Sequence, residues 1–489
     1  MKKNRLPFLF AGLLLTVLPI DTDAQRSGSS MNKQAHKALQ TLVEQEDRYR
    51  SIAKQIWSYA ELGYQEEKSS TLLKSTLEKE GFKIESGVAE IPTAFVASYG
   101  SGSPVIAILG EYDALPGVSQ AAVPQRQEME TGGAGHACGH HLCGTGSAAA
   151  AIAVRQWLEQ SGQSGTIRFY GTPAEEGGAG KVYMVRAGLF DDVDAVLHWH
   201  PGSSNGASAA SSLANKSAKF RFRGIASHAA ASPQNGRSAL DGVEAMNYMV
   251  NLMREHVLPD SRIHYVITRG GEAPNVVPEF AEVFYYCRHP EMSVVKENFE
   301  RIVKAAEGAA MGTGTTVDYE VIHGLYNVLP NETLSEIMYK NLQSVGGVHY
   351  DETETAFAEK IMESYTFEKK SPIESANKIQ PYQVINKGRG GSTDVGDVSW
   401  AVPTAGMRAA TWVPGTSAHS WQAVAAGGMS IGHKGMMVAA KTLTLTAIDI
   451  YLNPSVTKTA RKELIEKRGE NFVYKSLLGD RKPPLDYRK

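Results

Sequence analysis

The stretch Gly135-His136-Ala137-Cys138-Gly139-His140-His141 places three imidazoles and a thiol within six consecutive positions. A protein interior seldom holds so many titratable side chains together, because each buried ring or thiolate needs a partner. Metal coordination satisfies several such groups at once. The stretch therefore predicts that the chain is built around a metal centre.

The composition of the chain is that of an ordinary globular protein. It has 489 residues, of which 42% are hydrophobic and 21% charged, with a net charge of −2. This length is sufficient for two domains with separate cores, and the charge balance gives no indication of nucleic-acid binding. The three cysteines are too few, and odd in number, for a disulfide framework. Cys138 and Cys143 could pair, but a thiolate at Cys138 can bind a metal only if it remains free.

The N-terminal segment has the form of a secretory signal. A basic start, the apolar run 6–20 and a short polar segment follow one another in that order. We expect a signal peptide over residues 1–24, export to the periplasm or the medium, and no stable membrane anchor after cleavage. The alternative is an uncleaved anchor helix, for which the apolar run is short.

Several strands predicted between residues 33 and 213 end in polar side chains. They are the strands at 105–109, followed by Glu111 and Asp113, at 166–170, followed by Glu175 and Glu176, and at 194–197, followed by His198 and His200. Their alternation with helices, such as the alanine-rich segment 145–158, is typical of an open α/β sheet. Ligands bind at the carboxyl ends of the strands in such a sheet. Residues 33–213 are therefore expected to form the first part of a metal-binding catalytic domain.

A different pattern begins at residue 214. Four strands and two helices are expected in the order strand, helix, strand, strand, helix, strand, which is ferredoxin-like. Residues 214–325 would thus form an α+β domain that interrupts the catalytic domain, whose second part would be 326–452. Residues 453–489 are expected to form a surface helix and an extension.

The predicted strand ends supply ligands for a pair of divalent ions. Zn²⁺, Mn²⁺ and Co²⁺ accept imidazole, thiolate and carboxylate, and two ions need about five or six ligands. The candidates are Cys138, His140, Glu176, either His198 or His200, and His419. Adjacent side chains in an extended segment point to different sides, so Glu175 could act as a general base while Glu176 binds metal. This combination would hydrolyse an amide through a metal-bound water.

Ordered motifs along the chain resemble a known family. The segments 136–140 and 173–178, together with His419, resemble the aminoacylase/carboxypeptidase class of two-metal amidohydrolases. The segments 111–117, 199–201, 224–230, 392–400 and 433–435 are similar to the branch of this class that contains the B subunit of aminobenzoyl-glutamate hydrolase. The similarity covers nearly the whole chain after the predicted signal.

This resemblance implies an architecture and a set of ligands. It implies an open α/β-sheet catalytic domain interrupted by a ferredoxin-like lid and dimerisation domain, and hence a homodimer. The metal ligands would be Cys138, His140, Glu176, His200 and His419. His141 stands where many relatives carry an acidic or amide residue, so its role is not assigned.

The resemblance also implies roles for residues outside the ligand set. Glu175 would be the general base. His228 in the lid would reach the partner subunit's active site and help to hold the scissile carbonyl oxygen. The carboxylate of the substrate would be held by Asn275, Arg288, Gly391 and Ser392.

The function expected is that of an exported, metal-dependent amidohydrolase with two divalent ions, Zn²⁺ or Mn²⁺, with Co²⁺ as a further choice. Its substrates would be N-acyl amino acids, aminobenzoyl-glutamate-like conjugates or dipeptides. Two alternatives remain. A serine hydrolase could use Ser204 in Gly202-Ser203-Ser204-Asn205-Gly206, although a small-residue tract follows where a nucleophile elbow needs a helix. A catalytically silent, metal-dependent binding protein would have no need of Glu175.

One further glycine motif is interpreted as packing. The run 144–149 fits the pattern of a dinucleotide-binding loop, but no buried strand is expected before it. We therefore expect its small residues to pack a helix closely behind the metal-binding loop.

Overall fold

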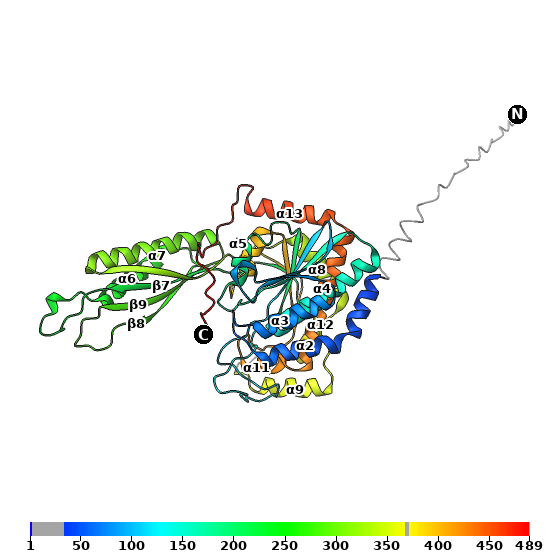
Figure 1. Cartoon of the computed structure of the whole chain (residues 1–489), viewed down its shortest axis with the longest axis horizontal. Coiled ribbons are helices and arrows are strands. Elements are labelled where there is room, and N and C mark those ends of the chain that lie inside the picture. Colours follow the sequence, from blue (N-terminus) through cyan, green and yellow to red (C-terminus); the bar gives the residue numbers. More distant parts are fainter. Residues whose placement is uncertain (2–33, 367–370, 489) are drawn as a thin grey trace.

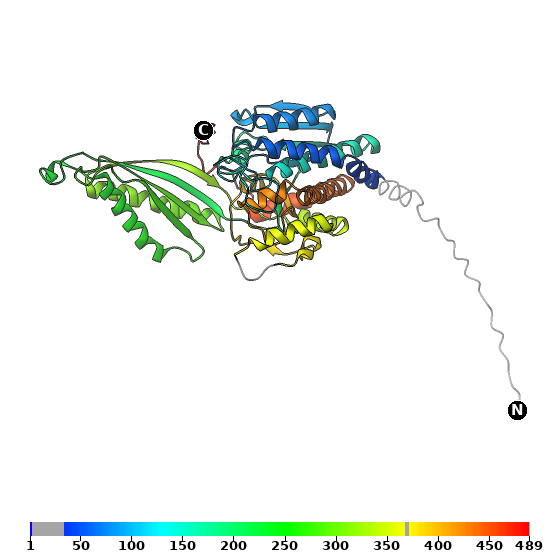
Figure 2. The same ribbon diagram turned by 90° about the horizontal axis from the view of Figure 1, so that it is seen from below.

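The computed structural model describes Met1, residues 34–366 and residues 371–488. The predicted signal peptide lies outside this described part, except for Met1. Figure 1 shows a larger unit built on an α/β sheet and a smaller, elongated α+β unit that projects from one side of it. Figure 2 shows the same projection from below.

A six-stranded sheet in the order β1-β2-β4-β3-β5-β12 forms the centre of the larger unit. The four strands on one side are parallel, namely β4 (Gly165–Gly171), β3 (Val105–Gly110), β5 (Ala195–Gly202) and β12 (Thr404–Ala410). The antiparallel strands β2 (Phe95–Ser101) and β1 (Lys83–Ser86) complete the other edge. Parallel strands are covered on both faces, which explains the continuous apolar run of β3. The expected open α/β sheet is confirmed.

Two long helices, α4 (His140–Ser161) and α12 (Ser430–Leu452), pack against each other beside the sheet. The larger unit also contains the helices α2 (Glu46–Tyr59), α3 (Glu67–Lys79), α5 (Gly180–Arg186), α8 (Glu332–Val345), α9 (Glu352–Glu363), α10 (Val395–Ala401), α11 (Trp421–Gly427) and α13 (Ser455–Arg468). By length and composition α12 could cross a membrane, but 78% of its apolar window is buried inside the protein. It is therefore a core helix in this fold.

The glycines of α4 allow a close approach to its neighbours. A Cβ atom at Gly144 would lie 2.7 Å from the backbone oxygen of Glu111, and one at Gly146 would lie 2.9 Å from Cγ of Met436. The motif 144–149 thus lies inside a packed helix, as expected. The helix begins at His140 rather than at Thr145, after Gly139 in the left-handed region with φ of 76°.

The smaller unit has the ferredoxin-like order of elements. These are β7 (Ala214–Arg223), α6 (Ala239–Met253), β8 (Arg262–Arg269), β9 (Phe280–His289), α7 (Met292–Thr313) and β10 (Thr316–Leu325). Its antiparallel sheet has the order β10-β7-β9-β8, with β8 at an edge. Alternate residues of β7, such as Phe220 and Phe222, are buried against the two helices in a separate core.

The segment after α13 differs from the surface extension predicted for it. Leu477 and Leu478 are each 4% exposed, and they belong to different cores. Leu477 packs in the core of the smaller unit, and Leu478 packs in a core of the larger unit. The segment follows the junction of the two units (Figure 1). The apolar residues of this segment follow neither a helical nor a strand period, so the sequence carried no periodic signal of this burial.

The close packing of α4 predicts a measurable cost for one added methyl group. Gly144→Ala should lower the free energy of unfolding by about 1–3 kcal/mol, because the Cβ atom meets a backbone oxygen that cannot rotate away. Gly312→Ala in α7 is the matched control, since its Cβ atom would meet no atom within 4 Å. The control should be neutral or stabilising by up to about 1 kcal/mol. Urea unfolding followed by circular dichroism measures both, and equal stability of the two variants would contradict the packing argument.

Candidate metal centre

The polar residues that follow the strands meet at one edge of the large sheet. Glu111 and Asp113 follow β3, and Glu175 and Glu176 follow β4. His200 lies within β5, which extends further than predicted. The carboxyl ends of parallel strands thus supply the site together with Cys138 and His140 at the start of α4.

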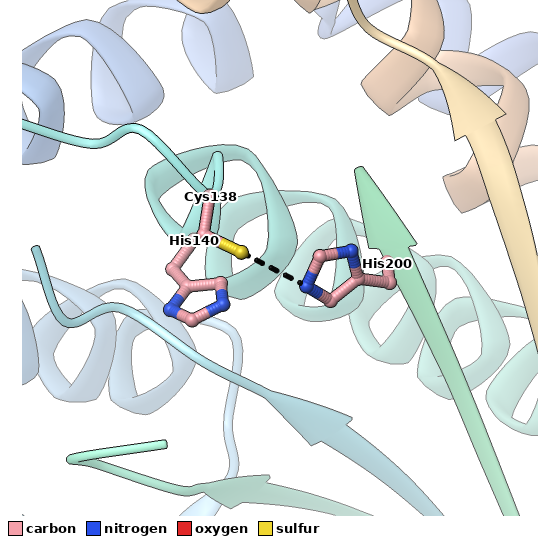
Figure 3. A group of neighbouring side chains, drawn as sticks. All are labelled: Cys138, His140 and His200. Atoms are coloured by element: carbon pink, nitrogen blue, oxygen red, sulfur yellow. Dashed lines mark hydrogen bonds between the residues drawn. The ribbon is translucent and has the colours of Figure 1, made fainter. Parts of the chain in front are cut away.

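The ligand atoms of the expected metal ligands form two adjacent groups. Those of Cys138, His140 and His200 lie within 4.8 Å of one another, and so do those of Cys138, Glu176 and His419. Figure 3 shows the first group, in which Sγ of Cys138 lies 3.4 Å from Nε2 of His200. Because Cys138 belongs to both groups, the structure brings all five expected ligands to one place.

The expected base lies in the same place as the ligands. Glu175 forms a third group with His140 and Glu176, again with ligand atoms within 4.8 Å. Both glutamates lie in a turn rather than in the extended segment predicted from the sequence, because Ala174 has φ of 57° and Gly177 φ of 92°. Their carboxylates are therefore close to each other and to His140.

Hydrogen bonds orient the imidazole rings. Nδ1 of His140 lies 2.8 Å from Oδ1 of Asp113, and Nδ1 of His200 lies 2.7 Å from the backbone oxygen of Pro201. Each Nδ1 then acts as the donor, which leaves Nε2 available for a metal. Asp113 also accepts from the backbone N–H of Glu176 at 2.8 Å, so one carboxylate orients two expected ligands.

The two glutamates of the turn differ in their protonation. Burial raises the pKa of Glu175 well above its usual range, and the neighbouring carboxylates of Glu111 and Glu176 add to this effect. Burial also acts to raise the pKa of Glu176, but the hydrogen bond from His419, at 3.1 Å, and the charge of His140 outweigh it and lower that pKa. Glu175 is therefore the better proton acceptor of the pair, and Glu176 the better anion.

A buried ion-pair network lies beside the glutamates. Nζ of Lys181 lies 2.7 Å from Oε1 of Glu111 and 2.8 Å from Oδ1 of Asp394. A further group of possible metal ligands consists of Glu111, Glu175 and Asp394. The ammonium of Lys181 already provides a positive charge beside Glu111 and Asp394. Burial would raise the pKa of Glu111, but Lys181 and His140 lower it to about 2.

The donor set fits divalent ions of the zinc type. Buried Nε2 of His140 lies 3.2 Å from Oε2 of Glu111, and Oε1 of Glu176 lies 3.1 Å from Nε2 of His419, so the candidate ligands contact one another. Burial raises the pKa of the Cys138 thiol, so a thiolate at this position needs a nearby cation. Thiolate, imidazole and carboxylate together are the ligands of Zn²⁺, Mn²⁺ or Co²⁺.

The position of His198 differs from that of His200. A Cβ atom at Gly406 of β12 would lie 2.1 Å from Nε2 of His198, so this ring packs against the neighbouring strand. His200 belongs to a ligand group, whereas His198 belongs to none among the described residues. The geometry thus favours His200 over His198.

His141 faces away from the ligand groups. Its Nε2 lies 3.0 Å from the backbone oxygen of Gly427, and its ring lies 4.9 Å from that of His136 between centroids. Burial lowers the pKa of His141 well below its usual range. It is therefore a neutral ring that joins α4 to α11.

The residues expected to bind the substrate fall into two separate sets. His228 and Asn275 are exposed and adjacent, with the N–H of Ala229 donating to the backbone oxygen of Asn275 at 3.0 Å. They follow the outer ends of β7 and β8, away from the larger unit (Figure 1). One protomer therefore does not bring His228 and Asn275 to its own metal centre.

The second set lies at the junction of the two units. Arg288 of β9 pairs with Asn215 of β7, and the N–H of Leu213 donates to the backbone oxygen of Gly391 at 3.1 Å. Arg288 Nε and Ser392 Oγ are buried atoms without a hydrogen-bond partner among the described residues. Arg288 and Gly391 thus both lie at the start of β7, apart from Asn275.

The surroundings of Ser204 do not form a nucleophile elbow. No helix follows it, since the next regular element is the short strand β6 (Ala209–Ala210), which pairs with β11 (Val384–Ile385). Within the described ranges, Ser204 makes no hydrogen bond to a histidine. The serine-hydrolase alternative therefore lacks its base.

Two residues of the site were absent from the sequence-based assignment. Lys181 follows Gly180 in the short helix α5, and no pattern in the sequence marks a lone lysine as buried. Asp394 lies in the segment 392–400, and no pattern in the sequence indicated a role for it. Its Oδ2 accepts from the backbone N–H of Lys181 at 2.9 Å.

Comparisons with known proteins agree with this geometry. Residues 107–423 match the profile of Peptidase family M20/M25/M40. The chain is 44% identical to the B subunit of p-aminobenzoyl-glutamate hydrolase of Escherichia coli, with 85% of this chain and 92% of that protein covered. It is 31% identical to a Xaa-Arg dipeptidase of Mus musculus, with 89% and 93% covered.

A solved structure of similar fold is that of the Bacillus subtilis YXEP protein, described as a dinuclear metal binding peptidase of the M20 family. It superposes with a TM-score of 0.56 at 18% identity and covers 83% of this chain and 98% of its own. The sequence matches extend over most of both chains, and the expected metal-binding and acidic groups meet at one site. The chain therefore belongs to Peptidase family M20/M25/M40 and is a metal-binding hydrolase of amide or peptide bonds.

Proposed function

We propose that this protein hydrolyses the amide bond of an N-acyl amino acid, an aminobenzoyl-glutamate-like conjugate or a dipeptide, with two divalent ions, Zn²⁺ or Mn²⁺ or else Co²⁺. The observation that carries the proposal is the position of Glu175 beside two ligand groups that share Cys138. When bound, the ions would polarise the amide carbonyl and acidify a water molecule. The ligands would be Cys138, His140, Glu176, His200 and His419.

Glu175 performs the proton transfers in this proposal. Its raised pKa suits a group that accepts a proton from water and then donates it to the leaving amine. Asp113 orients His140 and the backbone of Glu176, while Lys181 neutralises Glu111 and Asp394 beside the base. Arg288 and the Gly391-Ser392 segment would hold the substrate carboxylate, since a guanidinium pairs with it through two hydrogen bonds.

A homodimer would complete the site. β8 is an edge strand on which Val266 and Ile267 are 56% and 39% exposed, and Leu252 on α6 is 55% exposed. Unpaired edges and exposed apolar residues favour association with another chain. A second copy could thereby bring His228 and Asn275 to the metal centre.

The hydrogen bonds of His228 support such a role. Its Nδ1 accepts from the backbone N–H groups of Ala230 and Ala231 at 3.2 and 3.0 Å. Nε2 must then carry the proton and act as a donor. A donor of this kind could hold the carbonyl oxygen of a substrate in the partner subunit.

Export is a separate part of the proposal and depends on residues 1–24 alone. A basic start and a short apolar run support cleavage after Ala24 and transfer to the periplasm or medium. N-terminal sequencing of the protein made in a Gram-negative host tests it. An intact N-terminus in a membrane fraction would support the anchor helix instead.

The base assignment predicts the effect of one isosteric change. Glu175→Gln should retain the metal but lose about 10²–10⁴-fold in kcat, because the amide cannot accept the proton. Glu176→Gln is the comparison, since loss of an anionic ligand should lower the metal content instead. Metal analysis and turnover of an N-acyl amino acid on the same samples decide the matter. Near-normal turnover by Glu175→Gln would exclude this assignment.

Thiolate ligation predicts that metal protects Cys138. After removal of metal with a chelator, iodoacetamide at alkaline pH should modify Cys138 faster than in the metal-loaded protein. Cys143 and Cys287 are internal controls, because they are 1% and 0% exposed in cores and should react slowly in both states. Peptide mass spectrometry measures all three. Equal modification of Cys138 in the two states would remove it from the ligands.

The homodimer predicts complementation between two inactive variants. Glu175→Gln and His228→Ala should each be nearly inactive alone, but a mixed dimer has one site with its own Glu175 and the partner's intact His228. Random exchange of equal amounts makes about half of the dimers mixed, so about a quarter of the wild-type activity should return. A mass tag verifies the exchange. No recovery in exchanged dimers would show that His228 does not act in trans. Failure to self-associate would point to a different second subunit, as the name of the E. coli relative suggests.

A further inference from the structure

The last described segment of the chain, residues 470–488, contacts both units along its length. We call this segment the C-terminal strap. Leu477 lies in the core of the smaller unit and Leu478 in a core of the larger unit. The guanidinium of Arg481 donates to the backbone oxygen of Val321 on β10 at 2.6 Å. The strap thus runs along the junction, where Figure 1 draws it in dark red.

The strap is also bound to the larger unit beyond the buried leucines. Arg186 of α5 donates to the backbone oxygen of Gly479 at 2.8 Å. Gln65 donates to the backbone oxygen of Leu485 at 2.8 Å. These contacts hold the backbone of the strap close to its end, so its last side chains reach the site in a fixed position.

The end of the strap contacts the turn that carries the two glutamates. Oη of Tyr487 and a guanidinium nitrogen of Arg488 each donate to the backbone oxygen of Glu176 at 3.0 Å. The guanidinium of Arg488 also lies 5.1 Å from the centroid of the Tyr487 ring. In the described part of the chain, these two side chains are the donors to that oxygen.

The turn needs such contacts to keep its shape. Ala174 has φ of 57°, a left-handed conformation that a residue with a Cβ atom adopts only where its surroundings hold it. The N–H of Ala174 donates to Oε1 of Glu66, and the N–H of Glu176 donates to Oδ2 of Asp113, both at 2.8 Å. The larger unit therefore fixes the N–H groups of the turn, while the strap fixes the carbonyl of Glu176.

These contacts together set the direction of the Glu176 side chain. Peptide groups are planar. A hydrogen bond from the N–H of a residue therefore fixes the peptide plane before its Cα atom, and a hydrogen bond to its carbonyl oxygen fixes the peptide plane after it. Asp113 fixes the first plane and the strap fixes the second. Because Glu175 shares the first plane, its position depends on the same contacts.

We propose that Tyr487 and Arg488 are positioning residues, which hold the Glu175-Glu176 turn so that one carboxylate binds metal and the other accepts a proton. This inference rests on the proposed function for the roles of the two glutamates. It adds that the far end of the chain is part of the metal site.

The test compares the double variant Tyr487→Phe/Arg488→Gln with Lys482→Gln. Lys482 lies in the same strap, but its side chain is 82% exposed and, among the described residues, forms an ion pair only with Glu90, at 3.2 Å. Metal affinity is measured by competition with a chelating dye, without any substrate, and kcat and KM are measured on an N-acyl amino acid. The double variant should bind metal about 10-fold to 100-fold more weakly. Its kcat at saturating metal should fall about tenfold, with KM within about twofold.

The control and a conservative variant separate positioning from a general loss of structure. Lys482→Gln should match the wild type in every measurement. Arg488→Lys in the Tyr487→Phe background should recover part of the metal affinity, because an ammonium still donates to the Glu176 oxygen.

Two results would overturn the inference. The first is wild-type metal affinity and kcat in the double variant, and the second is an equal loss in Lys482→Gln. Failure of the proposed function has a different outcome, namely a wild type that binds metal but hydrolyses none of the amides. In that case the chelator competition still tests the strap.

Discussion

Lys181 holds its ammonium group in the interior of the larger unit, between Glu111 and Asp394 and beside the glutamate turn. Burial would lower the pKa of this amine, but Asp394 and Glu111 outweigh that effect and raise it. Removal of one partner from such a network leaves an uncompensated buried charge, which costs about 3–5 kcal/mol. The lysine thus allows several carboxylates to gather at one sheet edge before any metal ion arrives.

Two other groups of the site, the Glu175 carboxyl and the Cys138 thiol, have raised pKa values, and a further positive charge nearby would lower them. Burial raises the pKa of both Glu175 and the Cys138 thiol, so each group favours its protonated form where no cation is near. Binding of a divalent ion would favour the deprotonated forms and release protons. The fold therefore prepares the site by placing acids of different strength side by side. The hydrogen bonds from Asp113 then set the orientation of His140 and of the turn.

The fold and the meeting of the candidate ligands at one place could be predicted because their signals are local. Apolar runs that end in carboxylates or imidazoles mark the strand ends, and the His/Cys stretch marks the start of α4. The remaining features depend on contacts that are distant in sequence. Tyr487 lies 311 residues from Glu176, and no local pattern connects them. β12 was missed because Thr404–Ala410 is rich in alanine and poor in β-branched residues. The left-handed Ala174 was missed because glycine is the usual residue at such a conformation.

The position of the strap has a practical consequence for anyone who handles the protein. Arg488 lies against the backbone of Glu176, so an affinity tag or a fusion partner inserted directly after Arg488 would begin beside the glutamate turn. A bulky folded partner there would compete for space with the glutamate turn, and a polyhistidine tail would carry its own metal-binding groups to the same place. An exported form would lose any tag placed before residue 25. A purification handle is therefore best placed away from the strap.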